Sequence, residues 1–286
     1  IFCGTGLCLT GTKKQSVTGV SKSIRMQVGN LEITNESEVE IELPIQVDGM
    51  LLLPEKLNYQ FYSLTLQDLD NISGHHFKGD LTVKQSTLSG DVTIEGDLSI
   101  NGKTDLCGYH IYAGNITVDA ETVLSGGGLH TDTLYMNQKI VMKNEGDIIE
   151  AQDMEVQVKT SDSDYMTAGN IYITGNFNDV SSYYSTESQK YAFLPSGSHT
   201  ITFMKPDATP TDRAGITFYG SDSRLNRAVL VNKLNCYTLN REKEDIANEL
   251  ILGYEDYEKP TVPQNLTCTG KNCYSVSLKW DESEDN

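Results

Sequence analysis

Positive charge is scarce in this sequence. Its 286 residues include 22 Lys and Arg against 40 Asp and Glu, which gives a formal net charge of -18. A field of this sign repels phosphate groups, so we expect no nucleic-acid partner. No apolar run approaches the ~20 residues that a membrane helix needs, and Met50–Leu53 is only strand-sized, so we expect no membrane insertion.

Sequence motifs of common enzymes are also missing. There is no Gly-x-Ser-x-Gly elbow, no His-Glu-x-x-His helix and no phosphate-binding loop. The five histidines are scattered, and the His75–His76 pair lacks an apparent third metal ligand. We therefore name no catalytic residue and no cofactor, and we favour a protein that is not an enzyme. The metal is left unassigned, with Ca²⁺ kept open because an acidic surface can suit divalent cations.

What the sequence does contain is a recurring five-residue phrase: Gly, then Asp or Asn, an aliphatic residue, a polar residue and a second aliphatic residue. Six copies begin at Gly29, Gly79, Gly90, Gly96, Gly114 and Gly169. Gly followed by Asp or Asn favours a turn, and the alternation that follows sends both aliphatic side chains to one face of a short strand. One such strand cannot bury its own apolar face, so the copies must stack.

This stacking predicts an all-β protein built as an elongated β-solenoid, or β-helix, over residues 1–238. The copies are irregularly spaced, which favours loops of different length inserted at the corners. Pro44 interrupts an alternating run, and because proline cannot donate to a ladder we expect the strand to end there or to sit at an edge or a bend. Residues 239–259 are predicted to be a linker or a short capping helix, with Asn240 as its N-cap and 241–252 as its body.

Six cysteines are present. Cys268 and Cys273 flank Thr-Gly-Lys-Asn, a turn-like loop that could bring their Cβ atoms to bonding distance, so this pair is the candidate disulfide. Cys107 and Cys236 are expected to be buried apolar residues.

Two sets of polar residues are candidate binding groups. Asp80, Asp91 and Asp97 follow the Gly of their phrases, so stacking could align their carboxylates to hold a cation or to act as an acid and base pair. The alternative, which we favour, is that each Asp bonds its own backbone at a turn. Tyr183, Tyr184 and Tyr191 crowd a polar loop, where exposed rings could stack on sugars or anchor a protein partner.

The C-terminal residues resemble the first two strands of a bacterial fibronectin type III module. The residues that carry this resemblance are Pro260-Thr261-Val262-Pro263-Gln264-Asn265-Leu266 and Ser275-Val276-Ser277-Leu278-Lys279-Trp280-Asp281. It implies that residues 260–286 are the incomplete start of a β-sandwich and that Trp280 packs between its sheets.

The rest of the chain resembles the long β-strand repeat regions of large secreted proteins from Gram-positive bacteria. The Gly-Asp/Asn phrases carry this likeness, together with Gly11-Thr12-Lys13-Lys14-Gln15-Ser16-Val17 and Ala192-Phe193-Leu194-Pro195-Ser196-Gly197-Ser198-His199. The resemblance implies an extracellular or cell-surface location in bacteria.

Taken together, these features favour a structural or adhesive segment that is not an enzyme and that forms filaments or spaces neighbouring modules. Its expected partners are other copies of itself, adjoining modules or glycans. The alternative is a glycan-binding module or a β-helical polysaccharide lyase or hydrolase, which would show convergent carboxylates or bases on adjacent strands.

Overall fold

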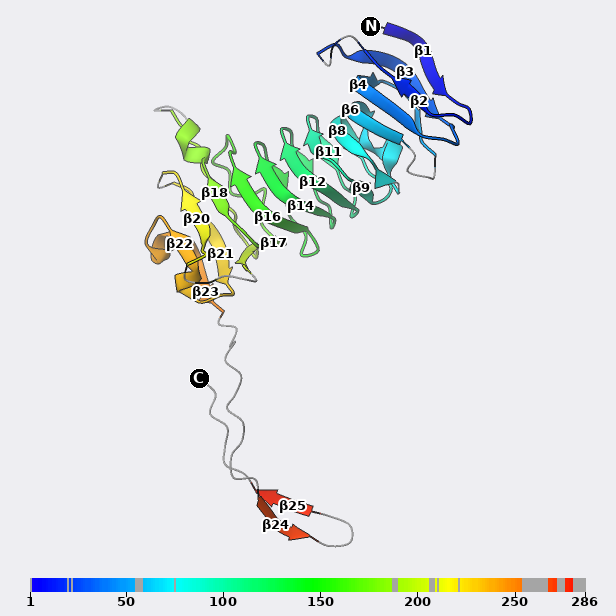
Figure 1. Cartoon of the computed structure of the whole chain (residues 1–286). Helices are drawn as coiled ribbons and strands as arrows, with labels where there is room; N and C mark the ends of the chain where they lie inside the picture. The colour runs from blue at the N-terminus through cyan, green and yellow to red at the C-terminus, as the bar shows by residue number, and fades with distance from the viewer. Residues whose placement is uncertain are drawn as a thin grey trace.

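The computed structural model describes residues 2–253 except 20, 22, 55–58, 75, 187–189, 206–208, 210 and 221, and also the strands at 267–271 and 276–279. The described chain forms a parallel β-solenoid of about 12 turns, whose coils stack from β1 to β23 (Figure 1). Among these residues, no helix is both long and apolar enough to cross a membrane.

In the described residues, 23 strands belong to the solenoid. They are β1 (Phe2–Leu9), β2 (Gln15–Val17), β3 (Met26–Ile33), β4 (Val39–Val47), β5 (Leu51–Leu52), β6 (Tyr59–Asp68), β7 (His76–Phe77), β8 (Gly79–Thr87), β9 (Val92–Ile94), β10 (Leu98–Ile100), β11 (Thr104–Asp105), β12 (His110–Val118), β13 (Thr122–Val123), β14 (Gly128–Met136), β15 (Ile140–Val141), β16 (Ile148–Val156), β17 (Asn170–Ile173), β18 (Phe177–Asp179), β19 (Thr200–Phe203), β20 (Ala214–Phe218), β21 (Leu225–Leu230), β22 (Tyr237–Leu239) and β23 (Ala247–Leu252). Four short 3₁₀ turns lie between them: η1 (Leu69–Ile72), η2 (Ser181–Tyr184), η3 (Leu234–Cys236) and η4 (Lys243–Asp245).

Each central coil contributes three strand segments. In the coil of β12 and β13, residues 110–113, 115–118 and 122–123 each pair in parallel with the next coil. The step between stacked residues is 18 positions from Asp97 to Asn115, 20 from His130 to Glu150 and 23 from Asp153 to Asn176. Coils of unequal length confirm the predicted solenoid with irregular insertions.

The repeated phrases form the core as predicted. Leu81, Leu98 and Ile116 stack in register, and all of them are buried. Both aliphatic residues of every copy are buried, because the strand alternation turns them toward the inside of the coil. The copies at Gly90 and Gly169 belong to a second column, which runs from Val92 through Ile111 to Ile171. The copy at Gly29 belongs to a third, since Leu31 pairs with Leu51.

Pro44 lies within β4, where the pairing with β6 shifts register between Ile41 and Pro44. The strand continues to Val47 on the other side of this irregularity. The strand therefore does not end at Pro44, and the register irregularity beside it recurs between Phe61 and Leu64 in the next coil, where there is no proline.

The predicted capping helix is wrong. Residues 247–252 form β23, which pairs in parallel with β21. Asn240 does not cap a helix: its side-chain amide bonds both the backbone N–H and the carbonyl of Phe218. The backbone groups of β21 offer a ladder, and pairing with it outweighs the weak helical pattern of these residues. Parallel pairing therefore continues past residue 238, to Leu252.

Near the C-terminus, β24 (Thr267–Lys271) and β25 (Val276–Lys279) form an antiparallel pair. Two strands were expected here from the resemblance to a fibronectin type III module. The β-sandwich assignment stays a prediction, and Trp280 lies outside the described residues.

Candidate functional site: a polar face on β12, β14, β16 and β17

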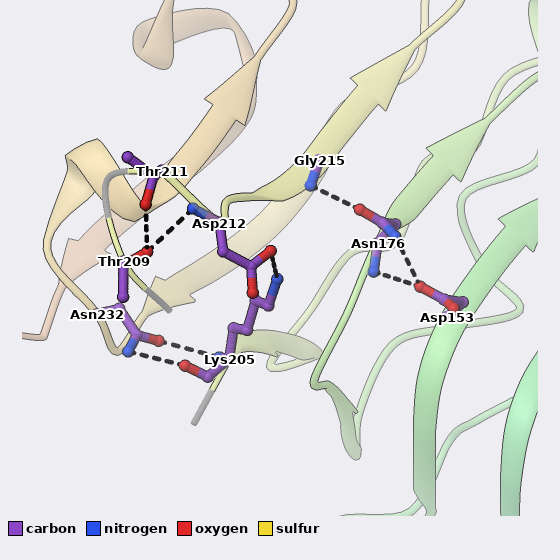
Figure 2. A network of polar contacts seen from close by, with 8 residues as sticks. All are labelled: Asp153, Asn176, Lys205, Thr209, Thr211, Asp212, Gly215 and Asn232. Atoms are coloured by element: carbon purple, nitrogen blue, oxygen red, sulfur yellow. Dashed lines mark hydrogen bonds and ion pairs between the residues drawn. The ribbon is translucent and has the colours of Figure 1, made fainter. Parts of the chain in front are cut away.

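Polar side chains at one corner of the coil serve the fold. The Asp97 Oδ1 atom accepts hydrogen bonds from the Asn115 backbone N–H at 3.0 Å and from its Nδ2 at 2.9 Å, while the Asp97 N–H donates to Asp80 Oδ1. The same pattern recurs in later coils. Figure 2 shows Asp153 accepting from Asn176, whose Oδ1 in turn accepts from the Gly215 N–H at 2.8 Å. We call this ladder the corner column.

Two predictions about Asp80, Asp91 and Asp97 are wrong: their alignment in one row and the hydrogen bonds that they make. Asp91 does not align with Asp80 and Asp97; its Oδ1 atom accepts from the His110 N–H at a different corner. The prediction that each carboxylate bonds the backbone of its own turn is also wrong. They bond the backbone of the next coil, because the corner brings that N–H within 3.0 Å.

A second polar column lies on the outward surface of the strands. Tyr112, His130, Glu150 and Tyr172 occupy matching positions on β12, β14, β16 and β17, and we call them the face column. The rings of Tyr112 and His130 stack, with centroids 4.3 Å apart and planes inclined by 11°. His130 Nδ1 lies 2.8 Å from Glu150 Oε2.

The hydrogen-bond chain continues to His110, whose Nδ1 is 2.9 Å from His130 Nε2. Glu150 can only accept when it is ionised, so His130 donates to it from Nδ1. When His130 is neutral, it accepts at Nε2 and His110 donates from Nδ1; when His130 carries a second proton, it donates from both ring nitrogens and His110 accepts. In both cases His130 bonds the Glu150 carboxylate and holds it in place.

Gly128 makes room for this chain. It pairs in register with His110, and a Cβ atom at position 128 would lie 2.7 Å from His110 Nδ1 and 2.5 Å from Ile148 Cγ2. Because Gly128 has no side chain, the His110 ring can extend over the next coil and reach His130. A glycine here therefore supports the arrangement of the face column.

A pocket of about 520 Å³ opens beside the face column. Its lining includes Glu150, Asp132, Gln152, Tyr172 and Met204. The Glu150 side chain is 53% exposed, so its carboxylate is accessible from solvent. Carboxylates, an amide, an aromatic ring and an apolar side chain converge at this point.

The predicted tyrosines lie elsewhere, in and after η2. Tyr183 and Tyr184 are exposed and make an edge-to-face contact with centroids 5.4 Å apart. The Tyr191 backbone N–H donates to Ser185 Oγ at 2.8 Å, so Tyr191 lies close to the end of η2. The role of the three tyrosines as ligand contacts stays a prediction.

The described cysteines include both buried and exposed side chains. Cys236 is buried, as expected, whereas Cys107 is exposed in a turn with a φ of 51°, so the expectation for Cys107 is wrong. Cys268 is exposed on β24 and Cys273 lies outside the described residues, so their disulfide stays a prediction. Within the described part of the chain, no group of three or more His, Cys, Asp and Glu is arranged to hold a metal ion.

Several ionisable groups are buried in the later coils. Burial raises the pKa of the Asp179 carboxyl, against the opposing effect of hydrogen bonds from Ser181 and Ser223. Burial also raises the pKa of Tyr165 and lowers that of His199, whose Nδ1 lies 2.9 Å from the Ala168 carbonyl oxygen. Burial therefore disfavours the charged form of each of these three groups.

The sequence analysis did not identify the face column, nor the role of Gly128 in making room for His110. His110, His130 and Glu150 come from three coils with steps of 20 residues between the bonded pairs, and no short motif joins them. Only the coil register shows that they align. The histidines themselves were visible in the sequence, but a matching carboxylate could not be chosen without that register.

Comparisons with known proteins identify no relative: no family model, no curated protein and no solved structure matches this chain. The protein is therefore defined by its fold and by its site, as a parallel β-solenoid with a polar pocket on one lateral face.

Proposed function

We propose that this chain is a structural and adhesive segment of a bacterial surface or secreted protein, which forms a rod that spaces or presents neighbouring modules. One observation carries this proposal: parallel pairing links each coil to the next, from β1 and β3 to β21 and β23. Bending such a rod requires breaking backbone hydrogen bonds and exposing buried side chains together, so the coil resists deformation.

The cellular location and the neighbouring modules rest on the two resemblances. The hairpin of β24 and β25 supports the proposed start of a fibronectin type III module, since both expected strands are present and antiparallel. Adjacent modules or other copies of the chain are the partners we propose. They would pair with strand edges at the ends of the solenoid and could extend it into filaments.

Electron microscopy of the full chain across a concentration series tests this role. About 12 coils at a spacing of ~4.8 Å predict a rod roughly 55–60 Å long. Fibres that lengthen with concentration would support self-assembly, and single rods would support a spacer. A compact particle without a long axis would contradict the proposal.

Two substitutions on one strand provide a matched pair for the same experiment. Leu134→Asp places a charge at a buried position of β14, and we expect loss of the rod. Tyr135→Asp introduces the same side chain at the next, outward position, and we expect the rod to survive. Equal effects of the two substitutions would contradict the assigned register.

A second candidate function is favoured by the pocket beside the face column. The glycan-active alternative required convergent carboxylates or bases on adjacent strands. Glu150 and Asp132 line one pocket from neighbouring coils, and His130 contacts Glu150. This convergence supports ligand binding as an additional function of the rod.

A further inference from the structure

We propose that the pocket bounded by Glu150, Asp132, Gln152, Tyr172 and Met204 binds an uncharged sugar ring of a glycan. This proposal rests on the second candidate function above, for which it names the class of ligand, and it does not depend on the spacer role. Its volume of about 520 Å³ lies within the roughly 300–1,000 Å³ range of small-molecule sites.

The aromatic rings in and near the pocket are suited to a ring-shaped ligand that has an apolar face. Tyr172 lines the pocket, and the stacked rings of Tyr112 and His130 lie further along the same column. His130 and Tyr172 are separated by two strand spacings, or roughly 10 Å, with Glu150 between them. Aromatic side chains combine a large apolar surface with a polar tip, which matches the C–H face and the hydroxyl edge of a sugar.

The polar groups of the pocket favour a ligand that both donates and accepts hydrogen bonds. Glu150 and Asp132 accept, whereas the Gln152 amide and the Thr174 hydroxyl can do both. A polyhydroxyl ligand satisfies all of these groups. An ammonium group carries donors alone, so it could bond both carboxylates, the Gln152 carbonyl oxygen and the Thr174 hydroxyl oxygen, but it would offer no acceptor to the Gln152 NH2 group.

Charge excludes the acidic sugars. The chain carries a formal net charge of -18, and two carboxylates line the pocket itself. An anionic sugar would be repelled both at a distance and on contact. Neutral sugars remain as the class that fits the charge, the rings and the hydrogen-bonding groups.

Glu150 is held in place before the ligand arrives. Its Oε2 atom is bonded by His130, which is bonded by His110, and Gly128 leaves the space that His110 occupies. His130 is therefore a positioning residue for Glu150. A fixed carboxylate loses little conformational freedom on binding, which strengthens its contribution to affinity.

The test measures binding to the full chain by saturation-transfer NMR and calorimetry. The probes are neutral oligosaccharides of glucose, mannose, galactose, xylose and N-acetylglucosamine, with a trilysine peptide and an oligogalacturonate as charged comparators. We expect at least one neutral oligosaccharide to bind and the oligogalacturonate not to bind.

Three variants locate the binding. Tyr172→Ala and Glu150→Gln should each weaken binding by roughly ten-fold or more, through loss of a stacking surface and of a charged acceptor. Glu150→Gln is nearly isosteric, so it tests the site without a cavity. Glu155→Gln is the control, since it removes the same charge from β16 at a residue outside the pocket, and we expect binding to be unchanged.

The proposal is overturned if no neutral oligosaccharide binds, if binding persists in both pocket variants, or if trilysine binds more tightly than every sugar. The last outcome would assign the pocket to a cationic ligand. None of these results changes the rod seen by microscopy, so the binding proposal and the structural proposal can fail separately.

Discussion

The corner column and the face column are both produced by the stacking of coils, but the corner column stabilises the backbone whereas the face column borders a pocket. Each places a polar residue on successive coils: Asp97 and Asn115 at the corner, His130 and Glu150 on the face. At the corner, carboxylate and amide oxygens accept backbone N–H groups of the next coil. On the face, the side chains bond one another and border a pocket.

The difference follows from where backbone donors are available. Along the strands, each N–H is already paired with the neighbouring coil. At a corner the chain leaves the ladder, and the N–H groups there need another acceptor. A polar residue at a corner is therefore recruited to the fold, whereas one in the middle of a strand faces solvent and can meet a ligand. Removing single residues from each column can test this distinction.

The largest effect is expected at Asp147, a buried corner carboxylate. Its oxygens accept backbone N–H groups of Gly126 at 2.5 Å, Lys143 at 2.7 Å and Asn144 at 2.9 Å. Asp147→Ala leaves these donors without their acceptor, and we expect a loss of about 2–4 kcal/mol in the free energy of unfolding. Denaturant unfolding monitored by circular dichroism measures it.

The control for Asp147 is Glu150→Ala, which removes an exposed carboxylate from the face column itself. We expect its free energy of unfolding to change by less than about 1 kcal/mol, because exposed ion pairs contribute little to stability. Equal destabilisation by the two substitutions would remove the distinction between corner and face.

A smaller effect is expected at Gly128, which supports the face column. Gly128→Ala forces a Cβ atom toward His110 and Ile148, so the His110 ring must move and its bond to His130 is lost. We expect a cost of about 1–2 kcal/mol in stability together with a change in the hydrogen bonding of the His110 and His130 rings. Nitrogen-15 NMR of the histidine rings reports that change directly.

Gly146→Ala is the matched control for Gly128, because its nearest contact to an added Cβ would be an ordinary 3.6 Å. Its histidine spectrum should match that of the unmodified chain. Unchanged histidine signals in Gly128→Ala would show that the glycine does not position His110.

The smallest effect concerns Asp48, an exposed carboxylate that accepts hydrogen bonds from three glutamine side chains. Hydrogen bonds from Gln27, Gln46 and Gln67 lower the pKa of Asp48 to about 2. In the unfolded chain the pKa of an Asp side chain is about 3.9. The hydrogen bonds of Asp48 therefore stabilise the folded state fully above that pH, and this stabilisation is lost as the pH falls toward 2. Exposure to solvent keeps the effect small.

Denaturant midpoints of the unmodified chain and of Asp48→Asn, compared between about pH 5 and pH 2, check this dependence. The advantage of the unmodified chain should shrink as the pH falls. A difference that stays constant across this range would mean that Asp48 has no favourable partners in the folded state.

The limits of sequence reasoning are clearest at residues 240–252. Asn240, Ile246 and Leu250 fit a short helix when read alone, yet residues 247–252 form a strand. Local pattern is a weak guide for such a segment, because the decisive partner, β21, comes from the preceding coil. Cys107 was misjudged for a similar reason: its place in an exposed turn depends on where the coil changes direction.

The sequence by itself determined the repeating unit. Gly with Asp or Asn specifies a corner, and the alternation after it decides that residues such as Leu98 and Ile100 turn inward. Those are local properties of five residues, so they could be read directly. The tertiary structure alone decided the register, and coils of 18, 20 and 23 residues choose which side chains stack. His110, His130 and Glu150 became one hydrogen-bonded chain because each coil returns the backbone to the same face, a long-range consequence of coil length that no short motif encodes.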